Sequence, residues 1–152
     1  MEEIFLNNNC EEDVMEIERY LRKINCIVRL KGREILNDIN ITIPQFTALQ
    51  ILIHEEESLT IGELSQKMAL ACSTITDLID RMEKNKLVER RKDLRDKRIV
   101  RIEVMPLGNE LVQKVLEKRR EYLQEQLGSF NKEDKTKLKE CLKILYNAIR
   151  EE

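Results

Sequence analysis

The segment from Thr60 to Arg101 constrains the fold of this chain more than any other part of the sequence. Thr60 is followed three residues later by Glu63, which is the pattern of a helix-capping box, so a helix is predicted to begin there. The small residues Ala69 to Ala71 predict a tight turn, and Ser73 begins a second predicted helix. Apolar residues at steps of three and four predict the buried face of that second helix. They are Ile75, Leu78, Ile79 and Met82.

A charged β-hairpin is predicted directly after the two helices, with strands at Leu87–Arg90 and Arg98–Val104. Nine basic and three acidic side chains give residues 84–101 a net charge of +6, whereas the whole chain carries −2 and the remainder therefore −8. Such a local cluster steers a protein toward polyanions, although a merely solvated hairpin has the same composition. The basic residues of the hairpin are Arg90, Arg91, Lys92, Arg95, Lys97, Arg98 and Arg101.

Helices are also predicted before this segment. Residues 1–11 are polar and expected to be frayed or loop-like, and Glu12 to about Leu36 is predicted to form a long helix. After a break at Asp38–Thr42, Pro44 is expected in the first turn of a compact helix, which the acidic loop Glu55–Ser58 follows. The long helix has its apolar residues on one narrow stripe, which is typical of packing against other helices. That stripe is Val14, Ile17, Leu21, Ile24, Val28 and Ile35.

Two more helices are predicted after the hairpin. Pro106 begins the first, Gly128 ends it, and Lys135–Arg150 forms the second. One side of this last helix is apolar, and a core as small as this one cannot cover both terminal stripes. We therefore expect a homodimer formed through the two ends of the chain. The apolar side comprises Leu138, Cys141, Leu142, Leu145 and Ile149.

Composition argues against several classes of protein. The 152 residues suit one domain, the N-terminus is acidic without an apolar signal segment, and no apolar run approaches a bilayer span, so a cytoplasmic protein without a membrane partner is expected. His54 is the only histidine, and the sequence contains no glycine-rich phosphate loop and no nucleophile motif. We therefore expect no enzyme, no cofactor, no catalytic residue and no metal site. The four cysteines form no CxxC pair and are expected to be free thiols.

Particular residues across nearly the whole chain resemble a MarR/SlyA-family winged helix-turn-helix regulator. The alternation of aspartate and arginine in Asp93-Leu-Arg95-Asp96-Lys-Arg98 is the most specific match, because it resembles the family's wing motif at the right distance after the helix pair. The resemblance implies a mainly α fold with a small β-hairpin wing. It further implies, in a single MarR-like chain 1–152, a DNA-binding core at 44–104 between dimerisation helices at 12–37 and 107–150. The other matching residues are Ile41-Thr42, Gln45-Phe46, Leu49, Thr60, Glu63-Leu64-Ser65, Met68, Ser73-Thr74-Ile75-Thr76, Leu78-Ile79, Met82-Glu83, Leu87-Val88 and Arg90.

The chain departs from the family pattern around the hairpin. Lys86 stands where the family usually has glycine between the second helix and the wing, so either Lys86 is left-handed or the turn shifts to Asn85. Val104-Met105 replaces the family's Leu-Thr, and Pro106 is expected to offset the lost threonine cap.

The resemblance implies that the helix from about Ser73 to Glu83 lies in the major groove of double-stranded DNA. Among its residues, Arg81 is long enough for a bidentate contact with guanine. Arg98 would enter the minor groove, and Asp96 would orient Arg98 or Arg95; the less favoured alternative for Asp96 and Asp93 is loop solubility alone. The implied DNA-binding residues are Ser73, Thr74, Thr76, Asp77, Arg81, Arg95, Asp96, Lys97 and Arg98.

Three functions remain open at the level of sequence. The leading hypothesis is a homodimeric regulator, expected to be a repressor, that binds an inverted-repeat operator and is released by a small aromatic or phenolic ligand. A second is a thiol-switched regulator of the same fold, using Cys26 or Cys72, although Cys26 is expected to be a buried small residue and Cys72 to be a small residue at a turn. A third is a winged-helix module that binds protein, which the positive hairpin argues against.

Overall fold

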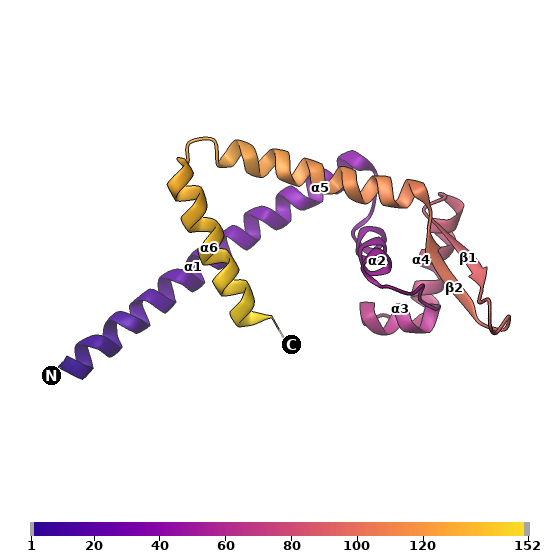
Figure 1. Ribbon diagram of the computed structural model, residues 1–152, viewed down its shortest axis with the longest axis horizontal. Helices are drawn as coiled ribbons and strands as arrows, with labels where there is room; N and C mark the ends of the chain where they lie inside the picture. Colours follow the sequence, from indigo (N-terminus) through magenta and orange to yellow (C-terminus); the bar gives the residue numbers. More distant parts are fainter. Residues whose placement is uncertain (1, 151–152) are drawn as a thin grey trace. The chain divides into compact units, whose positions relative to one another are not determined.

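The computed structural model describes the backbone of residues 2–150 and the side chains of residues 11–150. Its elements in chain order are α1 (Glu2–Ile39), α2 (Ile43–His54), α3 (Ile61–Met68), α4 (Cys72–Lys84), β1 (Val88–Lys92), β2 (Val100–Val104), α5 (Pro106–Gln126) and α6 (Lys132–Ile149). They are labelled in Figure 1. The chain divides within α5 into two compact units, Met1–Val115 and Leu116–Glu152, and each unit is described by itself. The predicted fold class, mainly α with a β-hairpin wing, is confirmed.

The first helix begins ten residues earlier than the sequence pattern predicts. Residues 1–11 were expected to be frayed or loop-like, but α1 is continuous from Glu2. The polar residues there include no glycine or proline, so a helix nucleated by the apolar stripe can propagate backward through them. The helix ends close to the predicted break, where Asn40 takes a left-handed φ of 60°. The N–H of Ile41 then donates to the carbonyl of Leu36 at 3.0 Å.

Two capping boxes set the starts of α2 and α3. Thr42 caps α2 by accepting from the N–H of Gln45, whose side chain accepts from Thr42 in return, and Pro44 lies in the first turn as predicted. The predicted box of Thr60 and Glu63 is present at the start of α3, with Glu63 accepting from the N–H of Thr60 at 2.7 Å. Each box satisfies backbone donors that the first helical turn leaves without partners.

The turn between α4 and the wing keeps its left-handed residue at Lys86. Its φ is 59°, whereas Asn85 has an ordinary φ of −86°, so the expected alternative of a shift to Asn85 is wrong. Two hydrogen bonds close the end of the helix, from Lys86 N–H to Glu83 and from Leu87 N–H to Met82, both at 2.9 Å. This Schellman closure satisfies the last carbonyls and holds a lysine where glycine would be less strained.

The wing is a two-stranded antiparallel hairpin in which Val88 pairs with Val104 and Lys92 with Val100. The two strand ends next to the loop were predicted about two residues too early. β1 continues to Lys92 and not only to Arg90, and β2 starts at Val100 and not at Arg98. The loop is closed instead by hydrogen bonds between Asp93 and Ile99 and between Ile99 and Asp96, both at 2.9 Å. Ile102 also pairs with Leu59, which attaches β2 to the segment before α3.

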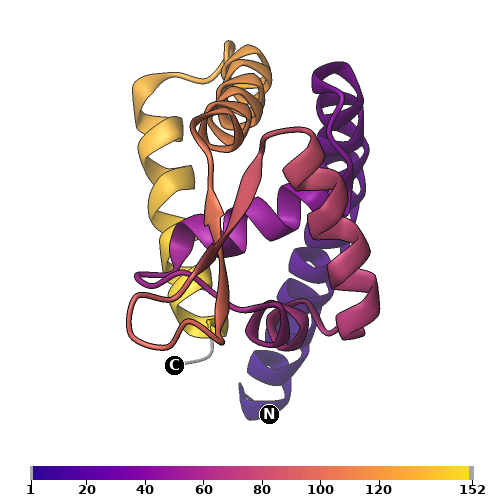
Figure 2. The ribbon, with the colours of Figure 1, turned by 90° about the vertical axis from the view of Figure 1, so that its right-hand side faces the viewer.

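The core of the first unit lies between α2, α3, α4, the hairpin and the start of α5. Its fully buried large side chains are Leu49, Leu64, Ile75, Ile79, Met82, Val88, Ile102 and Val115. Gly108 of α5 makes a close approach there, since a Cβ on it would lie 2.4 Å from the carbonyl oxygen of Leu87. The core thereby fixes α4 and the wing on one framework, and Figure 2 shows both together, with the wing loop extending away from α3 and α4.

The second unit contains the end of α5 and the whole of α6. Asn131 caps α6 by accepting from the N–H of Asp134 at 2.8 Å, so this helix starts three residues before the predicted Lys135. No residue of α6, whose side chains the structure describes in full, is buried. None of the helices described has the length and apolar composition needed to cross a membrane.

Candidate nucleic-acid interface

Helix α4 presents a polar face opposite the side chains that anchor it. Ile75, Ile79 and Met82 are completely buried, which fixes the rotation of the helix about its axis. The residues implicated by the sequence then face outward and are exposed, namely Ser73, Thr74, Thr76, Asp77 and Arg81. The hydroxyl of Thr76 donates to the carbonyl of Cys72 at 2.8 Å, and its remaining acceptor capacity is free to meet a ligand.

Two aspartates organise the wing loop. Asp96 accepts from the backbone N–H and Nε of Arg98 at 3.0 Å and from Nη2 at 2.8 Å, so the predicted orienting bond goes to Arg98. Asp93 accepts from the N–H groups of Arg95 and Asp96, both at 3.0 Å. The side chain of Arg98 remains 90% exposed in spite of this pairing. The loop is therefore held by its acids while the Arg98 guanidinium still faces solvent.

Arg101 ties the base of the wing to the loop between α2 and α3. Its Nε donates to Asp93 at 2.7 Å, and its Nη1 donates to the carbonyl of Ser58 at 2.6 Å. The N–H of Asp96, the Arg101 guanidinium and the N–H of Arg95 together lower the pKa of Asp93 from 3.8 to about 2. Because the folded pKa is depressed, Asp93 stabilises the wing fully above its unfolded pKa of 3.8 and loses that contribution as the pH falls toward 2.

Arg90 extends from β1 to the acidic side of α4. Its Nη1 lies 2.6 Å from Glu83 and its Nη2 lies 2.6 Å from Asp80. Burial would lower the pKa of Arg90, but hydrogen bonds to the two carboxylates outweigh burial and raise it. Arg91, the next residue, turns instead to Glu89 and Glu103 within the hairpin.

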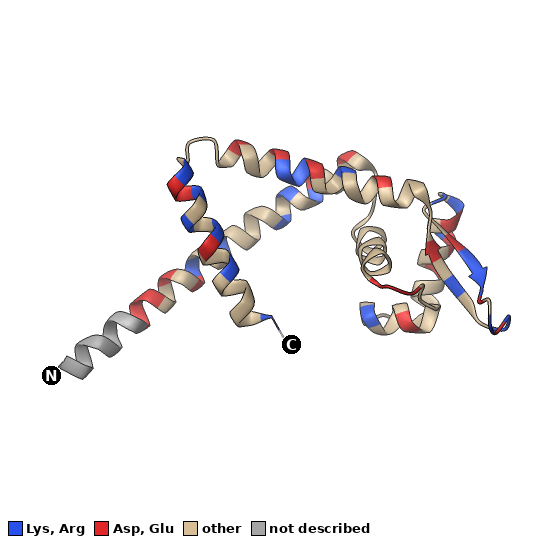
Figure 3. Ribbon diagram, viewed as in Figure 1, with Lys and Arg blue, Asp and Glu red and all other residues tan. Residues whose placement is uncertain are grey.

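These pairings show how much of the basic charge predicted for the hairpin is opposed by acids within the protein. Figure 3 shows acidic residues on α4 and on the strands beside the basic ones. Four of the seven basic hairpin residues are ion-paired, namely Arg90, Arg91, Arg98 and Arg101. Within residues 11–150, Lys92, Arg95 and Lys97 lie in no such pair, and they carry the unopposed charge of the wing.

Comparison with known proteins identifies the family to which this combination of helix and wing belongs. The sequence profile of the MarR family matches residues 41–100. The HTH-type transcriptional regulator YsmB of Bacillus subtilis is 56% identical over 123 residues, which cover 81% of this chain and 84% of that protein. The structure of a MarR family protein from Bacillus stearothermophilus matches with a TM-score of 0.79 and 46% identity, covering 91% of this chain and 96% of the other. The chain belongs to the MarR family.

The same winged-helix fold occurs in a complex of MepR from S. aureus with DNA. That structure matches this MarR-family chain with a TM-score of 0.68 and 22% identity, and the match covers 88% of this chain and 99% of the other. At this identity the likeness shows a shared fold. The profile match and the relatives at 56% and 46% identity show that this chain is a MarR-family transcriptional regulator with the winged-helix fold.

The cysteines of the MarR-family chain differ from expectation in one respect. Cys26 was expected to be buried, but Cys26, Cys72 and Cys141 are all exposed in the single chain, and all three are free thiols. Cys26 lies within residues 11–30 of α1, where every side chain is exposed. The Cys72 Sγ lies 3.2 Å from the hydroxyl oxygen of Ser65. Cys10 falls outside the residues whose side chains are described.

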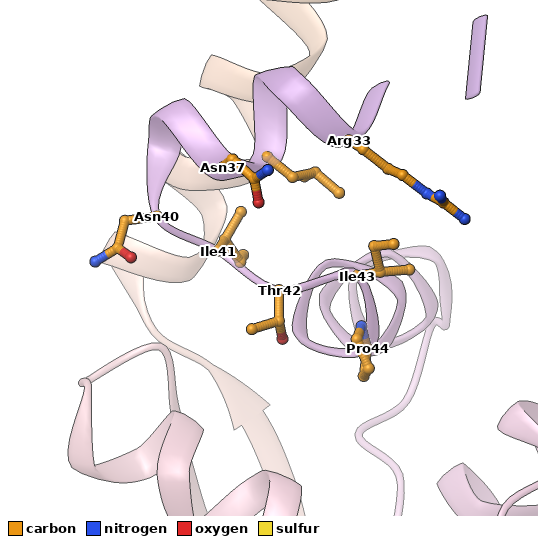
Figure 4. Close-up of a pocket in the computed structure, with 8 residues that line it drawn as sticks. Arg33, Asn37, Asn40, Ile41, Thr42, Ile43 and Pro44 are labelled. Carbon is orange, nitrogen blue, oxygen red and sulfur yellow. The ribbon is translucent and has the colours of Figure 1, made fainter. Parts of the chain in front are cut away.

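A pocket of about 380 Å³ opens at the junction of α1 and α2. Leu36 and Ile41 supply buried apolar surface, and the side chains of Arg33, Asn37 and Thr42 supply polar groups (Figure 4). The sequence predicted a break here but gave no sign of a cavity. A mixed lining of this kind suits a small ligand with one apolar and one polar side.

Proposed function

We propose that this MarR-family regulator is a repressor that binds an inverted-repeat operator as a homodimer and is released by a small-molecule effector. The observation that carries the proposal is the exposed polar face of α4 on the same framework as a wing with three unpaired cations. A single α-helix fits the major groove of B-DNA, and an arginine fits the narrow minor groove beside it. The DNA complex of MepR, a protein of the same fold, supports this arrangement.

The side chains have different proposed roles. Ser73, Thr74, Thr76 and Asp77 meet base edges or phosphates, and Arg81 is the candidate for a bidentate contact with guanine. On the wing, Arg95 and Lys97 bind phosphates, while Asp96 holds Arg98 in the orientation that enters the minor groove.

Exposed apolar side chains support the homodimer. On α1, Val14, Ile17, Leu21, Ile24 and Val28 are between 43% and 60% exposed. On α6, Leu138, Leu142 and Ile149 are between 36% and 69% exposed. Contiguous apolar stripes of this length are costly in water, and a second copy of the chain would cover both. A symmetric pair then presents two copies of α4 and of the wing to two half-sites.

The pocket at the junction of α1 and α2 supports release by an effector. A small aromatic or phenolic acid could place its ring against Leu36 and Ile41 and its carboxylate near Arg33. The pocket joins the helix proposed for dimerisation to the first helix of the winged core. A ligand there would change the spacing of the two α4 helices and weaken DNA binding, provided that it binds the released state more tightly.

The deciding experiment is selection of genomic DNA fragments on the purified protein, followed by sequencing. Enrichment of an inverted repeat with A·T-rich flanks supports the proposal. If no repeat is enriched while the protein captures another protein, the chain is a winged-helix interaction module. Candidate acids are then tested for release of the selected fragment, which separates the effector hypothesis from the hypothesis of a thiol switch.

A further inference from the structure

The helix proposed to read DNA carries more acid than base. Between Cys72 and Lys84 there are three acidic residues and only two basic ones. Among the acids, Asp80 is 57% and Glu83 38% exposed, so neither is hidden in the core. A carboxylate that approaches DNA is repelled by phosphates on both strands, so a helix of this composition is poorly suited to a groove by itself.

One side chain from the wing bridges two of these acids. Arg90 is only 26% exposed and holds Asp80 and Glu83 with separate nitrogens, each at 2.6 Å. Its backbone N–H donates to the second oxygen of Glu83 at 3.2 Å. The planar guanidinium presents two donors in a fixed fork, and a lysine ammonium could not span both carboxylates in this geometry.

The same contacts leave Arg90 little capacity to bind DNA. Its outer nitrogens are occupied by carboxylates that compete with any phosphate, and its position on β1 is set by the ladder with Ile102. Arg90 therefore differs from Lys92, Arg95 and Lys97, whose charges are unopposed. Any effect of Arg90 on DNA affinity is therefore indirect and acts through its contacts with α4.

We propose that Arg90 is a positioning residue for DNA binding, which bridges Asp80 and Glu83 on α4, offsets half of their combined negative charge and fixes strand β1 against that helix without itself contacting DNA. The inference rests on the proposed DNA-binding function and deepens it. On this proposal, the net charge at the surface of α4 depends on a residue of the wing. Replacing either α4 or the wing alone with that of another family member would therefore disturb the charge balance. A recognition helix with this acidic edge requires a wing strand with arginine at this position.

The test is a double-mutant cycle on operator affinity. Arg90→Gln is introduced into the wild-type chain and into a chain that already carries Asp80→Asn and Glu83→Gln. In the wild-type background, Arg90→Gln leaves two carboxylates facing DNA in each protomer, and affinity is expected to fall at least about tenfold. In the background without the acids there is nothing to neutralise, and the loss is expected to shrink to about twofold or less.

Arg91→Gln is the matched control, because Arg91 is the adjacent arginine and pairs within the hairpin. It should change affinity by the same factor in both backgrounds. The salt dependence supplies a second readout, since a lost phosphate contact lowers the slope of log affinity against log salt by about 0.9 per site. Arg90→Gln should leave that slope unchanged in the background without the acids.

Three outcomes overturn the inference: an equal loss in both backgrounds, a slope lowered by a full contact, or no loss of affinity from Arg90→Gln in the wild type. If Arg90→Gln fails to fold, Arg90→Lys keeps the charge but not the fork, and it should show the same coupling to the two acids at a smaller size. A wild-type chain that binds no DNA would instead refute the proposed function, and that result is seen before any variant is measured.

Discussion

The winged core and the terminal helices differ sharply in how they treat their apolar residues. In the core, large side chains from six elements, such as Leu49, Ile75 and Ile102, are at most 1% exposed. In α1 from residue 11 to residue 30, every side chain is exposed, although the apolar stripe there is as regular as any in the chain. The spacing of apolar residues is therefore as regular on the exposed face of α1 as on the helix faces that other parts of the chain cover. The difference shows that the core is covered by contacts within the chain, whereas the apolar stripe of α1 is left open for the partner that we propose.

The largest expected effect comes from a charge placed on the apolar side of α6, at the half-buried Leu145. Leu145→Asp should dissociate the proposed dimer, because an aspartate cannot be desolvated in an apolar interface. Operator affinity should fall by about 10²–10⁴-fold, since the two half-sites are then bound independently. Sedimentation and DNA titration measure the two effects together. Asn147→Asp adds the same charge two residues away and should leave both unchanged, and a Leu145→Asp protein that stays dimeric would contradict the assignment of this face.

A cavity in the core should cost stability without changing which residues meet DNA. Leu49→Ala removes a side chain that is completely buried. The free energy of unfolding should fall by about 2–5 kcal/mol, measured by urea denaturation at a fixed protein concentration. Leu94→Ala is the control, because Leu94 in the wing loop is 97% exposed and its truncation should change stability by less than about 0.5 kcal/mol. Similar losses for the two variants would show that the core does not fold by its own packing.

Gly108 tests the core from the opposite direction, by adding one methyl group. A Cβ there would lie 2.4 Å from the carbonyl oxygen of Leu87 and 3.0 Å from the side chain of Leu49. Gly108→Ala should therefore destabilise the protein by about 1–3 kcal/mol, although alanine is the better helix former. Gly62→Ala is the matched control, since its nearest contact would be Thr60 at 3.9 Å. Thermal unfolding should rank Gly62→Ala at or above the wild type, and a stable Gly108→Ala would mean that α5 does not pack this closely.

The wing contact should be smaller and should depend on salt. Arg98→Ala is expected to weaken operator binding about tenfold, mostly through A·T-rich flanks. It should also lower the slope of log affinity against log salt by about 0.9 per contact, or nearly two per dimer. Lys139→Ala on α6 should bind like the wild type. Equal affinities for the two variants across a salt series would show that Arg98 is a solvated loop residue without a contact to DNA.

The smallest expected effect is that of removing the thiols. A variant with serine at Cys10, Cys26, Cys72 and Cys141 should still bind the operator and be released by the effector. Cys26 and Cys72 are exposed, so an oxidant can reach them. Exposure alone, however, provides no mechanism by which oxidation of a thiol would move α4. Fluorescence titration of labelled operator, with and without peroxide, makes the comparison. Loss of peroxide-dependent release in this variant alone would establish the thiol switch.

Local hydrogen bonds could be predicted from the sequence. The box of Thr60 and Glu63, the start of α2 at Thr42 to Pro44 and the break after Ile39 all depend on residues within about one helical turn of each other. Their geometry is the same in any helix, so spacing alone identifies them. The polar outer face of α4 follows equally from the steps between Ile75, Ile79 and Met82.

The strand ends and the turn at Lys86 could not be predicted in the same way. A run of charged residues from Arg90 to Asp93 has no apolar alternation, so it cannot show where the ladder stops. Lys86 competes with Asn85 for the left-handed position on propensity alone. The decision falls to Leu87, because its burial and its hydrogen bond to Met82 require the chain to turn at Lys86.

By itself, the sequence determined the order of helices, the capping box of α3, the buried face of α4 and the net charge of the wing. Only the tertiary structure decided which cations are paired with carboxylates, because Arg90 meets Asp80 and Glu83 and Arg101 meets Asp93 across turns and strands. Composition counts charges, whereas pairing depends on the register of the hairpin and on its packing against α4. The close approach at Gly108 was also decided there. The physical reason is common to these cases: contacts within one turn have fixed spacing, and contacts between elements exist only once the core has set the elements in place.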